Sequence, residues 1–137
     1  MPAARKIIEV VGAIIVRGNC YLVGKRPAGK SQAGLWEFMG GKIEPGETPE
    51  QALVRECREE LALEIVPEGV LGSVVHDYPE KTVRLTLIRC HPAPGSEPTA
   101  LEHEQILWVR PGELRRLPLC PADAELAVKI FGSDEKR

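Results

Sequence analysis

One strongly signalled helix constrains this chain more than any other feature. Residues 48–61 begin with Thr48 as a capping residue and Pro49 at the first helical position, and Gln51 completes a capping box. The apolar residues that recur at four-residue spacing are Leu53, Cys57 and Leu61. They predict a helix with one buried stripe, which must pack against other apolar segments.

Short segments rich in β-branched and apolar residues flank this helix and predict strands. Residues 7–16 and 20–25 predict a hairpin, because the three residues between them are turn formers. Further strands are predicted at 70–75, 81–90 and 106–109, short helices at 111–117 and 122–131, and a frayed tail at 133–137. In 137 residues, this order predicts one α/β domain, 1–137, with a mixed sheet between helices.

Composition excludes several classes of partner. The formal net charge of −2 gives no basic excess, so we expect no nucleic acid polymer as a partner. The apolar run 10–16 is too short to span a membrane, and the first residues do not have the pattern of a signal peptide, so we expect a cytoplasmic location. Four scattered cysteines without a C-x-x-C pair predict reduced, mostly buried thiols, with disulfides as the minor alternative.

Three glutamates of the predicted helix indicate a cation-binding site. Glu56, Glu59 and Glu60 fall within an arc of roughly 100°, beside the buried stripe. Carboxylates gathered there repel one another unless a cation lies among them, and oxygen ligands favour Mg²⁺ or Mn²⁺. An isolated E-x-x-E-E is more often a solvated helix face paired with neighbouring arginines. The glycine-dense residues 40–47 just before the helix favour the metal site, because glycine lets the backbone approach phosphate or metal closely.

The segment 41–63 resembles the Nudix box, G-x5-E-x7-R-E-U-x-E-E-x-G-U, in which U is bulky and apolar. Cys57 stands at an apolar position, and Ala62 stands where the family has glycine. The matching fixed positions are Gly41, Glu47, Arg55, Glu56, Glu59, Glu60 and Leu63. The flanking residues 35–42, 102–108 and 119–123 resemble the MutT-type branch, which includes 8-oxo-dGTP diphosphatases and CTP pyrophosphohydrolases. The resemblance implies the Nudix fold, an α/β/α sandwich around a mixed β-sheet.

The resemblance also implies a role for each matching residue. The implied metal ligands are Glu56, Glu59, Glu60, Glu102 and the carbonyl of Gly40. The implied catalytic residues are Glu56, Glu59 and Glu102, and the identity of the general base stays open. The implied structural residues of the motif are Gly41, Glu47 and Arg55.

Four further residues are implied to contact the substrate. Arg26 and Lys42 would face phosphate, and Phe38 and Asp123 would contact the base. Three of them have a plainer alternative: Arg26 as a surface cation, Phe38 as a core residue and Asp123 as a first-turn acid of the last helix. Glu102 taken alone is more typical of an exposed loop acid, and its place before Trp108, as in the resembling branch, favours the functional role. The three histidines lack metal-ligand spacing, and we interpret them as surface or satisfied polar groups.

Taken together, the resemblance implies Mg²⁺-dependent hydrolysis of a nucleoside triphosphate to a nucleoside monophosphate and pyrophosphate. The leading substrate is 8-oxo-dGTP, and CTP or dCTP is the alternative. A hypothesis of another class is a non-catalytic nucleotide-sensing module. The presence of all three helix glutamates argues against it. The expected partner is the nucleotide alone, with the chain as a monomer or homodimer.

Overall fold

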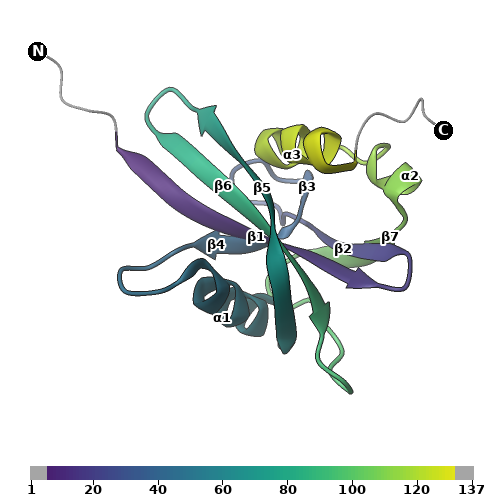
Figure 1. The fold of residues 1–137 in the computed structure, drawn as a ribbon. Coiled ribbons are helices and arrows are strands. Elements are labelled where there is room, and N and C mark those ends of the chain that lie inside the picture. The colour runs from purple at the N-terminus through teal and green to yellow at the C-terminus, as the bar shows by residue number, and fades with distance from the viewer. Residues whose placement is uncertain (1–5, 132–137) are drawn as a thin grey trace, which may run out of the picture.

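A mixed β-sheet lies between helices on its two faces in the computed structural model, which describes residues 6–131 (Figure 1). The described strands are β1 (Ile7–Arg17), β2 (Cys20–Lys25), β3 (Trp36–Glu37), β4 (Met39–Lys42), β5 (Ile65–Asp77), β6 (Thr82–Pro92) and β7 (Gln105–Val109). The described helices are α1 (Pro49–Leu61), α2 (Pro111–Leu114) and α3 (Pro121–Phe131). The predicted tail at 133–137 lies outside the described residues.

Strand β1 organises the sheet, whose order is β3-β2-β1-β6-β5. It pairs in parallel with β6 along most of its length, and antiparallel with β4 and, near its end, with β2. Strand β7 pairs antiparallel with β2. The predicted mixed sheet is therefore confirmed, because parallel and antiparallel pairs meet on one strand.

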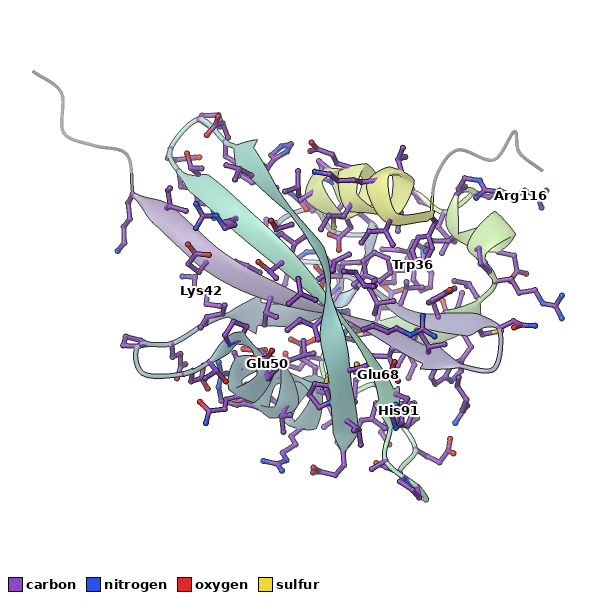
Figure 2. The ribbon with its side chains drawn as sticks, viewed as in Figure 1. Trp36, Lys42, Glu50, Glu68, His91 and Arg116 are labelled. Carbon is purple, nitrogen blue, oxygen red and sulfur yellow. The ribbon has the colours of Figure 1, made fainter. Side chains whose placement is uncertain are left out.

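The helices cover opposite faces of the sheet, with α1 on one side and α2 and α3 on the other (Figure 1). Beneath α1, the predicted stripe of Leu53, Cys57 and Leu61 is fully buried. Beneath α3, Leu126 packs in a second cluster with Trp36, which lies among the side chains on that side (Figure 2). Two buried clusters, one on each face, confirm the α/β/α sandwich. No helix within residues 6–131 is long and apolar enough to cross a membrane.

Helix α1 begins and ends at residues with identifiable caps. The backbone N–H of Gln51 donates to Thr48 Oγ1 at 3.1 Å, and that of Thr48 donates to Gln51 Oε1 at 2.9 Å, which confirms the capping box. At the other end, Ala62 has φ 52° and ψ 35°, the left-handed conformation. A residue with a Cβ atom pays about 1–2 kcal/mol for this conformation, and the Nudix box has glycine at this position.

Strand β5 differs most from its prediction, since it covers Ile65–Asp77 rather than 70–75. Its pairing with β6 shifts register between Pro67 and Gly69 and again between Val70 and Gly72. These irregularities break the alternation of apolar and polar residues from which a strand is predicted. Proline is tolerated because β5 lies at the edge of the sheet.

Glycine is required at one position where β4 lies against β1. Gly40 has φ 155°, and a Cβ atom added there would lie 1.8 Å from the carbonyl oxygen of Val11. Only glycine can pair this closely without displacing β1. The strand pairing therefore fixes the glycine-rich segment directly beside α1, where the acidic residues lie.

Candidate active site

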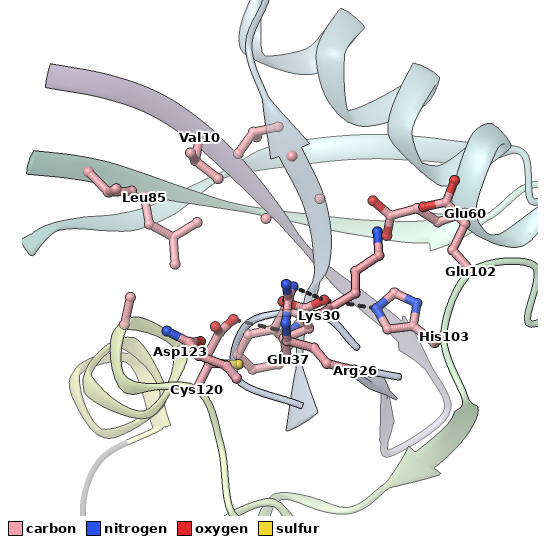
Figure 3. A pocket seen from close by; sticks show the side chains of 18 of the residues that line it. Val10, Arg26, Lys30, Glu37, Glu60, Leu85, Glu102, His103, Cys120 and Asp123 are labelled. Atoms are coloured by element: carbon pink, nitrogen blue, oxygen red, sulfur yellow. Dashed lines mark hydrogen bonds and ion pairs between the residues drawn. The ribbon is translucent and has the colours of Figure 1, made fainter. Parts of the chain in front are cut away.

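A cavity of about 330 Å³ opens between the end of α1 and the start of α3, within the usual size range of small-molecule sites (Figure 3). The predicted site residues that line it are Arg26, Phe38, Gly40, Gly41, Glu60, Glu102 and Asp123. The predicted residues outside its lining are Lys42, Glu47, Arg55, Glu56 and Glu59. Lining residues that the sequence interpretation did not assign to the site include Lys30, Glu37, Tyr78, His103 and Cys120. The cavity has an acidic end at α1 and a second end at α3.

Two carboxylates lie together at the α1 end. Glu60 is buried, and burial, followed by the neighbouring Glu56, raises the pKa of its carboxyl group well above the ordinary value. The glycine backbone makes room for them, since a Cβ atom on Gly41 would lie 2.5 Å from the carboxyl carbon of Glu56. Two acids held this closely in a half-buried position oppose each other's ionisation.

Glu59 lies further out than its two neighbours on the helix. Its side chain is 54% exposed, and Arg55 Nη1 is 3.5 Å from its Oε1. The three α1 glutamates do not gather within 4.8 Å of one another. Within residues 6–131 the acidic, histidine and cysteine side chains that do so are Glu37, Cys120 and Asp123, at the other end of the cavity.

Arg55 joins the glycine-rich segment to the helix. Its Nε donates to Glu47 Oε2 at 2.7 Å, and its Nη1 donates to Glu56 Oε2 at 2.8 Å. Its Nη2 donates to the carbonyl of Lys42 at 3.0 Å, whereas the Lys42 side chain is exposed. The hydrogen bonds from Arg55 lower the pKa of Glu47 to about 2, so this pair keeps its charge over the physiological pH range. The guanidinium thereby also orients one of the predicted metal ligands.

The α1 end fits a divalent cation. Glu60 and Glu56 bring hard oxygen donors together, and their ionisation is opposed until a positive charge lies between them. The backbone of Gly40 lies beside the same carboxylates, since its N–H donates to Glu60 and the residue lines the cavity. Glu102 reaches the cavity from the segment before β7. The residues that could hold the cation are Glu56, Glu59, Glu60, Glu102 and Gly40.

The α3 end is built from buried groups. Asp123 lies in the first turn of α3 with 8% of its surface exposed, and its Oδ1 accepts a hydrogen bond from the Phe38 N–H at 3.1 Å. Burial raises the pKa of Asp123 to about 7 and that of the Cys120 thiol to about 12. Phe38 is itself 4% exposed and packs in the core while lining the cavity. This end can therefore offer a neutral acid and an apolar wall.

Arg26 and Glu37 form an ion pair in the wall between the two ends. Arg26 Nη1 donates to both carboxylate oxygens of Glu37, at 3.1 and 3.2 Å, and its Nε donates to the Ser31 carbonyl at 2.6 Å. His103 Nε2 lies 2.9 Å from the same carboxylate. The sequence did offer a signal for Glu37, because it is a single acid between Trp36 and Phe38 in a short apolar segment. Of the two alternatives predicted for the histidines, His103 is not a surface group, because its side chain is 5% exposed, and only its Nε2 is satisfied by the residues that the structure describes.

Comparison with known proteins assigns the family. The model of the NUDIX domain family matches residues 10–128. The chain belongs to the Nudix family. The Nudix chain is 45% identical over 125 residues to the CTP pyrophosphohydrolase of Escherichia coli (strain K12), covering 88% of this chain and 89% of that one. It is 35% identical over 129 residues to the 8-oxo-dGTP diphosphatase of Haemophilus influenzae, covering 93% of each.

Solved structures agree with this assignment. The crystal structure of the MutT NUDIX hydrolase from Burkholderia pseudomallei superposes with a TM-score of 0.80 at 29% identity, covering 91% of this chain and 98% of that one. The expected Nudix hydrolase of MutT type and its fold are therefore confirmed. Nudix hydrolases generally use a divalent metal, in agreement with the paired carboxylates at the α1 end.

Proposed function

We propose that this Nudix hydrolase cleaves a nucleoside triphosphate into a nucleoside monophosphate and pyrophosphate, with Mg²⁺ as its metal and Mn²⁺ as a substitute. The observation that carries the proposal is that one cavity joins Glu60 and Glu102, with Glu56 beside Glu60, to the recess around Asp123 and Phe38. A polyphosphate needs the first end, and a base needs the second. The similarity to named pyrophosphohydrolases and diphosphatases supports the same reaction.

Each predicted site residue, in the wall or beside it, has a proposed chemical role in this reaction. A cation held by Glu56, Glu59, Glu60 and Glu102, with the Gly40 carbonyl, would neutralise the polyphosphate and acidify water. Glu59 or Glu102 takes the proton of the attacking water as general base. Arg26 and Lys42 hold the phosphates that are not attacked. The half-buried wall restricts water, so these charges act more strongly than in solvent.

The base end supports two related substrates. Asp123, with its pKa near neutrality, can donate or accept a hydrogen bond, and Phe38 forms an apolar wall beside it. We place 8-oxo-dGTP first, as in the 8-oxo-dGTP diphosphatase from Haemophilus influenzae. CTP or dCTP is the second candidate, because the Escherichia coli relative named for CTP is 45% identical. We further propose that residues 1–137 act as one domain in the cytoplasm, as a monomer or homodimer.

A product assay tests the proposal. Purified protein is incubated with normal and oxidised nucleoside triphosphates and Mg²⁺, and pyrophosphate and orthophosphate are measured separately. We expect pyrophosphate release that stops on chelation and returns with Mg²⁺ or Mn²⁺. Full activity in chelator, or release of orthophosphate alone, contradicts the reaction. Nucleotide binding without any turnover identifies the sensing module instead.

A further inference from the structure

His103 is packed into the wall of the cavity rather than placed on the surface. Its side chain is 5% exposed, and it directly follows Glu102 in the chain. The room for the ring comes from β2, because a Cβ atom on Gly24 would lie 2.6 Å from the imidazole. The next residue, Glu104, donates its N–H to the carbonyl of Lys25 at 2.9 Å. The segment that carries Glu102 is thus fastened to β2 at the position of the histidine.

The hydrogen bond to Glu37 determines which ring nitrogen carries the proton. His103 Nε2 lies 2.9 Å from Glu37 Oε2, and an ionised carboxylate only accepts hydrogen bonds. Nε2 must therefore be the donor. Nδ1 is buried and has no hydrogen-bond partner within residues 6–131. A neutral ring with hydrogen on Nε2 satisfies this geometry, whereas the other tautomer would bury an unpaired N–H and leave two acceptors facing each other.

Glu37 also binds a second side chain, that of Arg26. Its two oxygens also accept from Arg26 Nη1, so the carboxylate is held between an imidazole and a guanidinium (Figure 3). All three side chains line the cavity. They connect the segment of Glu102, at the acidic end, to the strand β3 that leads to Phe38 and Asp123 at the other end.

We propose that His103 is a positioning residue for the nucleotide: it holds the Glu37 carboxylate, and through it Arg26, in the orientation that binds the substrate between the two ends of the cavity. This inference rests on the proposed function for its substrate. It acts on binding rather than on the chemical step, because neither ring nitrogen is open to the reacting phosphate: Nε2 is engaged with Glu37, and Nδ1 is buried. Loss of the ring therefore raises KM more than it lowers kcat.

Two substitutions separate the hydrogen bond from mere packing. His103→Leu removes the donor, and we expect KM for the best substrate to rise about tenfold with kcat within about twofold. His103→Gln places an amide N–H near the position of Nε2, and we expect it to recover most of the affinity. His91→Leu is the matched control, because His91 also pairs with a glutamate, Glu68, but on the outside of β5 and β6 (Figure 2). It should leave KM unchanged.

A double-mutant cycle tests whether His103 acts through Glu37. In the Glu37→Gln background, His103→Leu should raise KM by less than about twofold, because the interaction is already weakened. Independent effects that multiply in the double variant overturn the proposal, and so does an unchanged KM in His103→Leu.

A measurement without turnover keeps this inference separate from the proposed function. If the wild type releases no pyrophosphate from any nucleotide, the proposed function fails, and the imidazole is then judged by its ¹⁵N chemical shifts. Hydrogen on Nε2 in the wild type, with a shift that changes in Glu37→Gln, supports the held carboxylate. A bare Nε2 overturns it, and this readout also serves if His103→Leu does not fold.

Discussion

The acidic groups at the two ends of the cavity differ in their surroundings and in their pKa values. At the α1 end, Arg55 contacts Glu47 and Glu56 directly, and the pKa of Glu47 falls to about 2. At the α3 end, Asp123 and Cys120 are buried, and their pKa values rise to about 7 and about 12. The pKa of Glu60, which lines the first end, is raised by burial and by the neighbouring Glu56, so these paired acids ionise fully only when a cation lies between them, whereas the pKa of Asp123 at the second end is raised mainly by burial. The difference matches a ligand with a charged polyphosphate and an uncharged base.

The largest effect should come from the α1 end. Glu59→Gln keeps the shape of the side chain but removes a predicted metal ligand or base, so we expect kcat to fall about 10²–10⁴-fold. Steady-state kinetics with Mg²⁺ measure it, and thermal unfolding shows that the fold persists. Glu50→Gln is the matched control, an exposed acid of the same helix. A Glu59→Gln enzyme with full turnover would show that the α1 end is not the site of chemistry.

The α3 end predicts an unusual dependence of stability on pH. Burial raises the pKa of Asp123 from 3.8 to about 7, so the folded chain binds a proton that the unfolded chain has released. Stability should therefore fall as pH rises from about 4 to about 7, by about 4 kcal/mol at most. Asp123→Asn cannot ionise and should make this decline shallower, leaving the part that comes from the raised pKa of Glu60, while residue 123 still accepts from the Phe38 N–H.

Urea unfolding at a series of pH values measures the decline. Glu125→Gln, which changes an exposed acid on the same helix, is the control and should keep the wild-type profile. A profile for Asp123→Asn that follows the wild type would show that Asp123 is ionised when folded, and that the contrast between the two ends does not hold.

A smaller effect should follow when the hydrogen bonds of Arg55 at the α1 end are weakened. Arg55→Lys retains one positive charge but cannot contact Glu47, Glu56 and the Lys42 carbonyl together. We expect Tm to fall by roughly 5 °C, and kcat to fall because Glu56 loses its orientation. Arg58→Lys is the control, since Arg58 pairs with Glu64 in solvent. Equal changes in Tm for the two variants would mean that the hydrogen bonds of Arg55 stabilise the protein no more than a surface ion pair does.

The smallest effect concerns the end of α1. Ala62→Gly relieves the left-handed backbone and should stabilise the protein by about 0.5–1 kcal/mol. Chemical unfolding measures the gain. Ala52→Gly, at a buried position near the start of the same helix, should have the opposite sign. A loss of stability in Ala62→Gly would show that the alanine side chain contributes packing that outweighs the strain.

Sequence-based prediction succeeded where neighbouring residues carry the signal. The capping box, the buried stripe and the bounds of β2 were confirmed from residues within a few positions of one another. It was less complete for β5, whose bulges break the alternating pattern, and for the wall of the cavity. The roles of the metal and base residues stay predictions, since geometry places them without showing their chemistry.

The residues from 41 to 63 by themselves determined the family, the helix and the set of acids at one end of the cavity, because a helix converts sequence spacing directly into position in space. The wall between the two ends, and the α3 end itself, were decided only by the tertiary structure. Glu37, His103 and Asp123 lie on three separate segments, and their hydrogen bonds arise when β2, β3 and α3 pack together. Burial raises the pKa of Asp123, and the hydrogen bond to Glu37 selects the tautomer of His103; both depend on contacts between residues far apart in the chain.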